Sequence, residues 1–304
     1  MESKNNDGWK RPNIAGMRGS REVFNQLYTH VSKNRNKDQW TVLNNVAIDG
    51  HVEVVRQLLK SDFNFESKNN CCWKPLMSAA YHGHVEVVRE LLEHDANVDS
   101  ASNFGWTALK CAAFGAKVEV IRELLERGAD VEGGSKSGRT STNYYAWTPL
   151  KTAAFHGFME VVRELLDSGA DVESADEDGW TALKTAAFTG KLEVVRELLK
   201  RGADKESENK DGWTALKTAA FNGHVEVVRE LLGHGSNTES EKENDWTALM
   251  VAAYSGNVTV VRELLERGAK VERKDKDGWT ALKIAIKYER MYVVEELQKY
   301  GASE

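Results

Sequence analysis

Histidine and cysteine side chains that could bind a metal gather in one part of the chain. Two adjacent cysteines are followed within 23 residues by three histidines: Cys71, Cys72, His82, His84 and His94. A structural zinc site uses two closely spaced pairs of ligands, and this segment contains only one such pair. We therefore expect neither a metal site nor a cofactor.

The sequence also lacks the motifs that are typical of a catalytic site. The many Asp and Glu residues recur at a regular interval, which predicts solvated surfaces rather than a paired general acid and base. The sequence contains no phosphate-binding glycine loop, no dinucleotide fingerprint and no nucleophile elbow. We expect no enzymatic activity.

The side chains whose regular spacing suggests a binding role are aromatic rings with lysine amines nearby in the sequence. The chain has nine tryptophans: Trp9, Trp40, Trp73, Trp106, Trp147, Trp180, Trp213, Trp246 and Trp279. A second aromatic residue follows eight positions later in six units, at Tyr81, Phe114, Phe155, Phe188, Phe221 and Tyr254. A lysine follows four positions after the Trp in five units, at Lys110, Lys151, Lys184, Lys217 and Lys283. Because aromatic residues dominate interface hot spots, these rows are candidates for recognition.

Length and charge narrow the class of protein further. The chain has 304 residues, a formal net charge of -6 and three cysteines. The sparse cysteines exclude a disulfide framework and favour a reducing compartment, so we expect a cytoplasmic protein, with the nucleus as the alternative. The sequence has no apolar run long enough for a membrane span and no signal peptide at its start. The negative charge argues against nucleic-acid binding, and we expect a monomer.

The tryptophan period specifies the elements that carry these side chains. Six of the eight intervals between consecutive Trp residues are 33 residues long, which is typical of a repeat array. In each unit, a Thr can cap a short Ala-rich helix such as ALKTAAF, which a Gly such as Gly190 ends. A second helix such as LEVVRELL turns Val and Leu inward, and Gly202 ends it. Its Glu193 and Arg196 predict an ion pair within one helix on a solvated face.

The repeated unit resembles the ankyrin repeat over the whole chain. The matching motifs are T-P-L at 148–150, G-H-V-E-V-V at 223–228 and G-A-D-V at 169–172. The resemblance implies an all-α repeat solenoid of helix-turn-helix units with β-hairpin or finger loops, in a right-angled, concave array. It also implies a structural hydrogen bond at the G-H histidine, His84. The family's Asn after G-A-D-V is Glu here, as at Glu173, so hydroxylation of that Asn is not expected.

The array accounts for the whole sequence as one domain, residues 1–304. Residues 1–39 and 279–304 are degenerate units, predicted to be terminal caps with a more polar outer face, and 40–278 are internal repeats. The 41-residue interval after Trp106 places an inserted finger at 133–140. Around this finger, four residues are candidate partner contacts: Lys136, Arg139, Tyr144 and Tyr145. The alternative is a tolerated surface insertion.

The rows of Trp, Phe and Lys predict a binding groove formed by the first helices and the fingers. Its candidate residues are Trp106, Trp147, Trp180, Trp213, Trp246, Phe155, Phe188, Phe221, Lys151, Lys184 and Lys217. The positive charge of each Lys interacts unfavourably with the helix dipole. A Trp ring, an acid two residues before the Trp such as Asp178, or an acidic partner would offset this cost. We expect an adaptor or scaffold that binds another protein, with an acidic peptide or protein segment as the candidate ligand.

Two other interpretations of the tryptophan row remain open. Each Trp can be a purely structural contact that stabilises the neighbouring repeat, since recent duplication copies a residue whether or not it binds anything. Alternatively, Trp with Glu or Asp can form an aromatic cage for a methylated or cationic tail.

Overall fold

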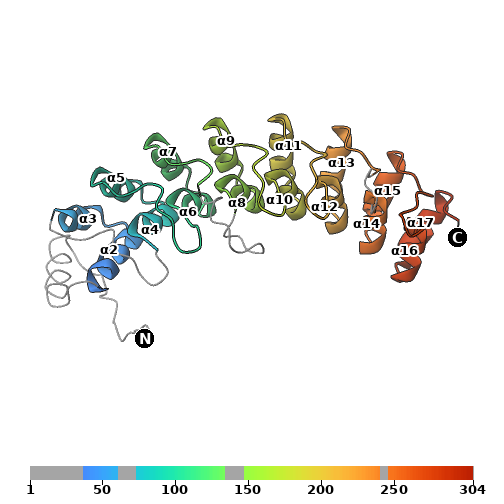
Figure 1. The fold of residues 1–304 in the computed structure, drawn as a ribbon, viewed down its shortest axis with the longest axis horizontal. Helices are drawn as coiled ribbons and strands as arrows, with labels where there is room; N and C mark the ends of the chain where they lie inside the picture. The colour runs from blue at the N-terminus through green and yellow to red at the C-terminus, as the bar shows by residue number, and fades with distance from the viewer. Residues whose placement is uncertain (1–36, 61–72, 134–146, 240–245, 304) are drawn as a thin grey trace. The chain divides into compact units, whose positions relative to one another are not determined.

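The computed structural model describes residues 37–60, 73–133, 147–239 and 246–303, and at 37–41 it gives secondary structure alone. The chain forms two compact units, residues 1–134 and 135–304 (Figure 1). The boundary between the units falls in the segment with eight extra residues. Lys136, Arg139, Tyr144 and Tyr145 lie outside the described residues, as do Cys71, Cys72 and most of the predicted N-terminal cap.

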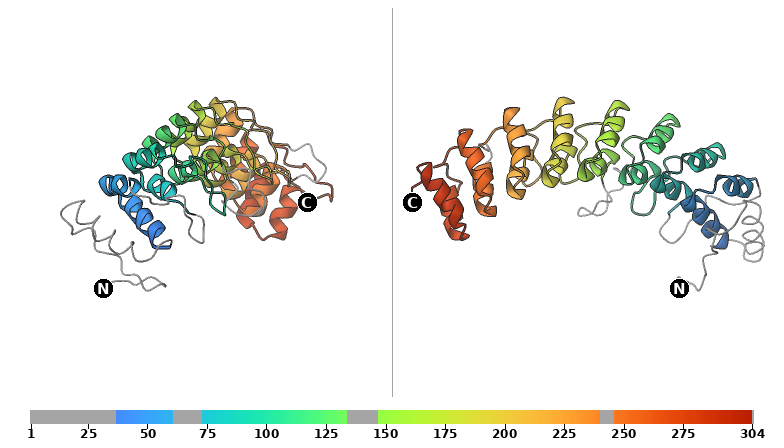
Figure 2. Two further views of the ribbon diagram at one scale, coloured as in Figure 1. Left: turned by 60° about the vertical axis from the view of Figure 1, so that its left-hand side comes forward. Right: turned by 180° about the vertical axis from the view of Figure 1, so that it is seen from behind.

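Each unit is built from helices that alternate between two layers (Figures 1 and 2). In the first unit, the inner layer holds α2 (Lys37–Asp49), α4 (Pro75–His82) and α6 (Ala108–Phe114), and the outer layer holds α3 (Val52–Leu59), α5 (Val85–Glu93) and α7 (Val118–Glu126). In the second unit, the inner layer holds α8 (Pro149–His156), α10 (Ala182–Thr189), α12 (Ala215–Asn222), α14 (Ala248–Ser255) and α16 (Ala281–Lys287). Its outer layer holds α9 (Met159–Asp167), α11 (Leu192–Lys200), α13 (Val225–Gly233), α15 (Val258–Glu266) and α17 (Met291–Lys299). Within a unit, each helix packs on the next helix of its own layer.

The inner helices begin and end where the sequence predicts. The Thr181 side chain caps α10 by accepting the backbone N–H of Lys184, which would otherwise lack a partner in the first turn. Gly190 ends α10 at a φ of 70°, in the left-handed region that a residue without Cβ adopts at little cost. The same Thr and Gly positions cap α12 and α14.

The two layers meet through small and branched apolar side chains. On α10, Ala186 and Ala187 are fully buried, and their small size lets neighbouring inner helices approach closely. On α11, Val194, Val195 and Leu198 are buried. Burial of a Val or Leu side chain contributes about 1.5–3 kcal/mol, so these apolar positions hold the layers together.

The segments between repeats are turns, and the described residues contain no β-strand, so the hairpin form of the finger is not found there. In one finger the backbone N–H of Asp176 donates to the carbonyl of Trp180 at 3.2 Å. The Asp176 side chain accepts the N–H groups of Asp178 and Trp180, and the Asp176 carbonyl accepts that of Gly179, so these N–H groups bond within the turn. Neighbouring fingers touch where Lys210 N donates to the Asp178 carbonyl at 2.9 Å.

The final repeat departs from the others in two respects. Glu289 occupies the left-handed position that Gly holds in α10, with a φ of 57°. Met291 and Tyr292 on α17 are 60% and 78% exposed, beside the exposed charged residues Lys287, Arg290 and Lys299. Ile286 is also exposed, at the position where Ala187 is buried by the next repeat.

Candidate binding surface

Where the structure describes the finger before a Trp, that finger holds the Trp in place. Four residues before Trp180, the Asp176 carboxylate accepts the backbone N–H of Asp178 at 3.1 Å and that of Trp180 at 2.9 Å. Asn209 does the same for Trp213, and Asp275 for Trp279. A short polar side chain at this position therefore fixes where the indole ring leaves the finger.

The Trp ring contacts the second aromatic residue of its own repeat. The ring centroids lie 5.4 Å apart for Trp106–Phe114, 5.2 Å for Trp147–Phe155, 5.9 Å for Trp180–Phe188, 5.4 Å for Trp213–Phe221 and 5.3 Å for Trp246–Tyr254. The Trp180–Phe188 and Trp213–Phe221 pairs are edge to face, an arrangement that aromatic rings favour. The structure thus brings together the Trp and Phe residues of the predicted groove.

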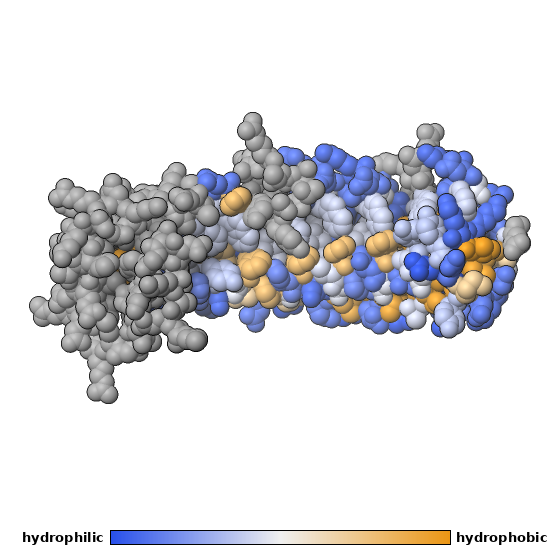
Figure 3. Space-filling view, turned by 90° about the horizontal axis from the view of Figure 1, so that it is seen from below, coloured by the Kyte–Doolittle hydropathy of each residue, from blue (hydrophilic) through white to orange (hydrophobic). Residues whose placement is uncertain are grey.

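Within the second unit, the second aromatic residues lie along the inner layer. Phe188 is 43% exposed and Phe221 37% exposed, whereas the Trp residues are half-buried. Phe221 stacks on Tyr254 at 6.2 Å, and Tyr254 meets Tyr288 at 4.5 Å. Figure 3 shows hydrophobic residues in a broken row on this face. In the second unit, Phe188 and Phe221 are therefore the predicted rings most available to a partner, and Tyr81 in the first unit is 38% exposed.

Four of the five lysines that follow a Trp by four positions are buried, whereas Lys283 in the final repeat is exposed. Lys110, Lys151, Lys184 and Lys217 are only 0%, 1%, 1% and 7% exposed. Lys151 Nζ lies 2.7 Å from Asp176 Oδ2, Lys184 Nζ donates to Ser207 Oγ at 2.8 Å, and Lys217 Nζ donates to the Gly212 carbonyl at 2.9 Å. The expectation that these amines face an acidic partner is therefore wrong, because helix and finger enclose them.

Burial changes the chemistry of two of these lysines. It lowers the pKa of Lys151, although the hydrogen bond and charge of Asp176 oppose the effect. It also lowers the pKa of Lys184, against the charges of Glu173 and Asp204. Asp176, four residues before the Trp, is the direct partner of Lys151, and Asp178 adds only a smaller electrostatic contribution.

One repeat shows what the lysine replaces. Met250 takes the lysine position on α14 and is buried. The following finger carboxylate then has no amine to bind, and Asp275 Oδ2 instead accepts the indole N–H of Trp246 at 3.2 Å. The link between an inner helix and the next finger thus persists when the lysine is absent.

Three of the described Trp rings have a lysine amine over their faces, and one of these contacts is Lys151 Nζ at 6.0 Å from the Trp147 ring centroid. Lys110 Nζ lies 5.3 Å from the Trp106 ring centroid. In the final repeat Lys287 takes the place of the second aromatic residue and lies 4.5 Å from the Trp279 ring. The cation–π contact considered from the sequence is therefore present, within the protein itself.

The outer layer carries ion pairs that join neighbouring repeats. In each pair an Arg of one outer helix reaches a Glu 34 residues further along, as in Arg163–Glu197 at 3.3 Å, Arg196–Glu230 at 2.8 Å, Arg229–Glu263 at 2.7 Å and Arg262–Glu296 at 2.6 Å. Of four pairs predicted at this spacing within one helix, Glu193–Arg196 is present at 2.7 Å. Glu86/Arg89, Glu160/Arg163 and Glu226/Arg229 form no such pair in the described structure, and their Arg residues bind a Glu of the next repeat instead. Sequence reasoning missed the pairs between repeats. A search for Arg and Glu residues that lie 34 positions apart, one repeat period plus one residue, would have found them.

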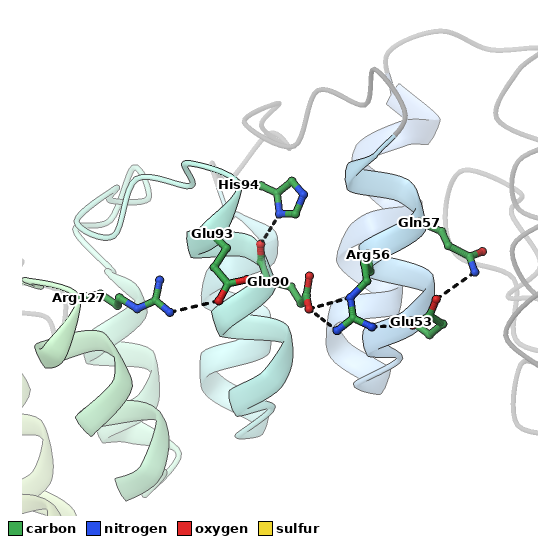
Figure 4. A network of polar contacts seen from close by, with 7 residues as sticks. All are labelled: Glu53, Arg56, Gln57, Glu90, Glu93, His94 and Arg127. Carbon is green, nitrogen blue, oxygen red and sulfur yellow. Dashed lines mark hydrogen bonds and ion pairs between the residues drawn. The ribbon is translucent and has the colours of Figure 1, made fainter.

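The first unit repeats this arrangement (Figure 4). Arg56 of α3 lies between Glu53 of its own helix and Glu90 of α5. Arg127, at the end of α7, reaches Glu93 of α5 at 3.5 Å. Each carboxylate on α5 in this network therefore has a cation from a neighbouring outer helix.

Ionisation of the buried outer carboxylates is favoured by these pairs. Hydrogen bonds from Arg262 and Lys299 lower the pKa of Glu296 to about 2, although burial opposes them. Burial also disfavours ionisation of Glu197, but hydrogen bonds from Arg201 and Arg163 outweigh it and lower the pKa. These charges are already paired inside the protein.

A third link between repeats uses the Glu that stands in place of the Asn of the ankyrin motif. Its carboxylate accepts a backbone N–H from the next repeat in Glu173–Asp204 at 2.7 Å, Glu206–Asn237 at 2.9 Å, Glu239–Lys270 at 3.0 Å and Glu272–Ser303 at 2.8 Å. This Glu therefore has a structural role between fingers.

The remaining candidate groups have structural surroundings. His84 Nε2 lies 2.8 Å from the carbonyl of Ile48, which confirms the structural hydrogen bond expected at that position. Cys111 is buried, and burial raises the pKa of its thiol, so it is not a reactive nucleophile at neutral pH. Within the described ranges, no group of three or more His, Cys, Asp or Glu residues is placed to hold a metal ion.

Comparison with known proteins agrees with this architecture. A family model for ankyrin repeats matches residues 12–102, 60–134, 134–209, 150–242, 203–275 and 235–304. A search of curated proteins found no match. Among the helices that the structure describes, none is long and apolar enough to cross a membrane. Ankyrin repeats are in general modules of protein–protein interaction and are typically non-catalytic. The matches cover nearly the whole sequence, and the chain belongs to the ankyrin-repeat family.

Proposed function

We propose that this protein is a non-enzymatic adaptor that binds another protein through the aromatic row of its inner helices and the adjoining fingers. The observation that carries the proposal is the exposure of Phe188 and Phe221, each held against a half-buried Trp. Large exposed aromatic rings on a rigid support are the usual anchors of protein interfaces, because little conformational entropy is lost when they bind.

The buried lysines do not contribute to this surface. Lys151, Lys184 and Lys217 stabilise the junction between helix and finger, and their amines have partners within the protein. They therefore give no support to an acidic partner. The residues around the inserted finger, Lys136 to Tyr145, are a separate candidate contact, tested by deleting residues 133–140 and measuring retained partners.

Affinity capture from cell extract, read by quantitative mass spectrometry, tests the proposal. We expect proteins retained by the wild-type chain to be lost from a Phe188→Ser/Phe221→Ser variant. The control is Met291→Ser/Tyr292→Ser, which removes two large and even more exposed side chains from the final repeat. Retention of the same proteins by all three chains, at unchanged melting temperature, would contradict the proposal.

A Trp180→Ala variant separates binding from a purely structural row. Removal of this half-buried ring is expected to lower the free energy of unfolding by about 2 kcal/mol, because Phe188 loses its support. On our proposal it also weakens partner capture. Lost stability with unchanged capture would indicate that the tryptophans serve the array alone.

A further inference from the structure

Two neighbouring repeats of the second unit combine exposed rings with an uneven distribution of charge. Phe188 on α10 and Phe221 on α12 belong to helices that pack on each other. Each ring contacts a Trp that directly follows a finger, Trp180 after residues 173–178 and Trp213 after residues 205–211. We call these two rings, their two Trp residues and the two fingers the Phe188–Phe221 surface.

The fingers of this surface are strongly acidic. They contain seven carboxylates, at Glu173, Asp176, Glu177, Asp178, Glu206, Glu208 and Asp211, and two amines, at Lys205 and Lys210. The excess is therefore five negative charges, seven minus two. The buried amine of Lys151 offsets one of them through Asp176. Glu177, Glu206 and Asp211 are exposed, so the excess charge faces solvent.

The acidic character is specific to these two fingers among those fully described in the second unit. The finger before Trp279, residues 272–277, has three carboxylates and three cations, at Arg273, Lys274 and Lys276. The repeat that follows that finger also differs, because Lys287 rather than a Phe contacts its Trp279. The exposed Phe rings thus adjoin the most negative of these fingers.

Rings and carboxylates together select one kind of ligand. Lys and Arg side chains can lay their aliphatic stems on aromatic surface and extend the charged head to a carboxylate. Their cations are also attracted to aromatic faces, and Arg is the more frequent partner. An acidic segment would meet a surface of its own charge.

We propose that the Phe188–Phe221 surface binds a linear segment of a partner protein that carries several Lys or Arg residues among apolar side chains. This inference rests on the proposed function and adds the charge of the partner to it. The apolar side chains cover Phe188 and Phe221, and the cations reach Glu177, Glu206 and Asp211.

Selection from a displayed library of random peptides of about 12 residues, against the full chain, tests the charge of the ligand without assuming its identity. We expect the selected peptides to be net positive and to contain apolar residues. A synthetic copy of one selected peptide is then titrated by fluorescence anisotropy. Raising the salt concentration from about 50 to about 300 mM is expected to weaken its binding several-fold, because exposed charges are screened.

Two charge-reversal variants assign the effect to this surface. Glu177→Lys/Asp211→Lys is expected to weaken binding of the synthetic peptide by at least about tenfold. Glu160→Lys/Glu226→Lys makes the same change of net charge on the outer helices, where it should alter binding by less than about twofold. Equal effects of the two variants would overturn the inference.

The outcomes also distinguish this inference from the proposed function. Net acidic or neutral peptides that are lost with Phe188→Ser/Phe221→Ser would overturn the inference and support the function. Peptides whose binding survives those substitutions, or a selection that yields no peptide, would overturn both. Net positive peptides lost with the Phe substitutions and with the charge reversal support both.

Discussion

The outer and inner layers of the second unit use their repeated polar and aromatic residues in opposite ways. On the outer layer, each Arg of the pairs from Arg163–Glu197 to Arg262–Glu296 binds a Glu of the next repeat. On the inner layer, Phe188 and Phe221 contact their own Trp and keep more than a third of their surface exposed. Both sets of residues recur with the repeat, so periodicity alone does not separate stability from binding. The difference lies in whether the side chain's contacts are already used within the protein.

Of the substitutions that test this difference, the largest change in melting temperature is expected on the outer layer. Glu197→Ala leaves Arg163 and Arg201 without the buried carboxylate that both contact. We expect the melting temperature to fall by about 4 °C, with no change in partner capture. Circular dichroism melts measure the shift, and Glu160→Ala, an exposed Glu of α9, is the control. A similar fall in both variants would mean that the pairs between repeats add nothing.

A smaller effect is expected from acid. The pKa of Glu296 is lowered from 4.5 to about 2 in the folded protein, so its ionised form stabilises the fold above pH 4.5. That contribution is lost as the pH falls from 4.5 towards 2, because the carboxylate becomes protonated. The fall in melting temperature between pH 5 and pH 2.5 should therefore be smaller in Glu296→Gln than in the wild type, by about 2–3 °C.

The matched control for this titration is Glu295→Gln, the exposed neighbour on α17. It should lose as much stability in acid as the wild type does. If the melting temperature of Glu296→Gln fell in acid as much as that of the wild type, the ion pair between Glu296 and Arg262 would not contribute to the pH dependence of stability.

The smallest effect is expected at the buried lysines. They belong to the inner layer, but their amines are enclosed and bonded within the protein, as the charges of the outer layer are. Lys184 lies on the inner layer and is nevertheless enclosed, and Met250 fills the same position in another repeat. We expect Lys184→Met to raise the melting temperature at pH 7 by about 1–2 °C, because an apolar side chain needs no desolvation. Partner capture should not change. A lower melting temperature would show that the bond to Ser207 outweighs the desolvation of the amine.

The pH dependence of this variant follows from the lowered pKa of Lys184. Between the folded pKa and 10.5, the unfolded chain binds the proton more than the folded one does, so wild-type stability rises with pH in that range. Lys184→Met lacks this rise, which urea melts at pH 7.5 and 9.5 can detect. Lys210→Met, on an exposed finger position, should behave as the wild type.

Local features of the fold could be predicted from the sequence, because they depend on residues close together in the chain. Thr181 caps α10 through an N–H three residues away, and Gly190 and Gly202 end helices by their own backbone conformation. The pairing of Trp with the aromatic residue eight positions later also lies within one repeat.

The candidate site was harder to predict because burial depends on the neighbouring repeat. Lys184 is enclosed by a finger whose Ser207 lies 23 residues away, and a lysine beside a Trp gives no local sign of this. Met250 was the available signal, since an apolar residue at one copy of a position indicates that the position is buried. Likewise, the acid that binds Lys151 is Asp176 rather than the one nearest to the Trp, because Asp176 is the residue that closes the finger turn.

The finger glutamates form one link between repeats that does not depend on the side chain that follows. Glu173, Glu206, Glu239 and Glu272 bind the backbone N–H of Asp204, Asn237, Lys270 and Ser303, four residues with unlike side chains. Because the main chain is the acceptor's partner, a repeat can be followed by any other repeat without loss of this bond. Exchange of a whole repeat would therefore leave this bond in place, whereas the Arg–Glu pairs of the outer layer and the Lys151–Asp176 pair require matching side chains on both sides of the junction.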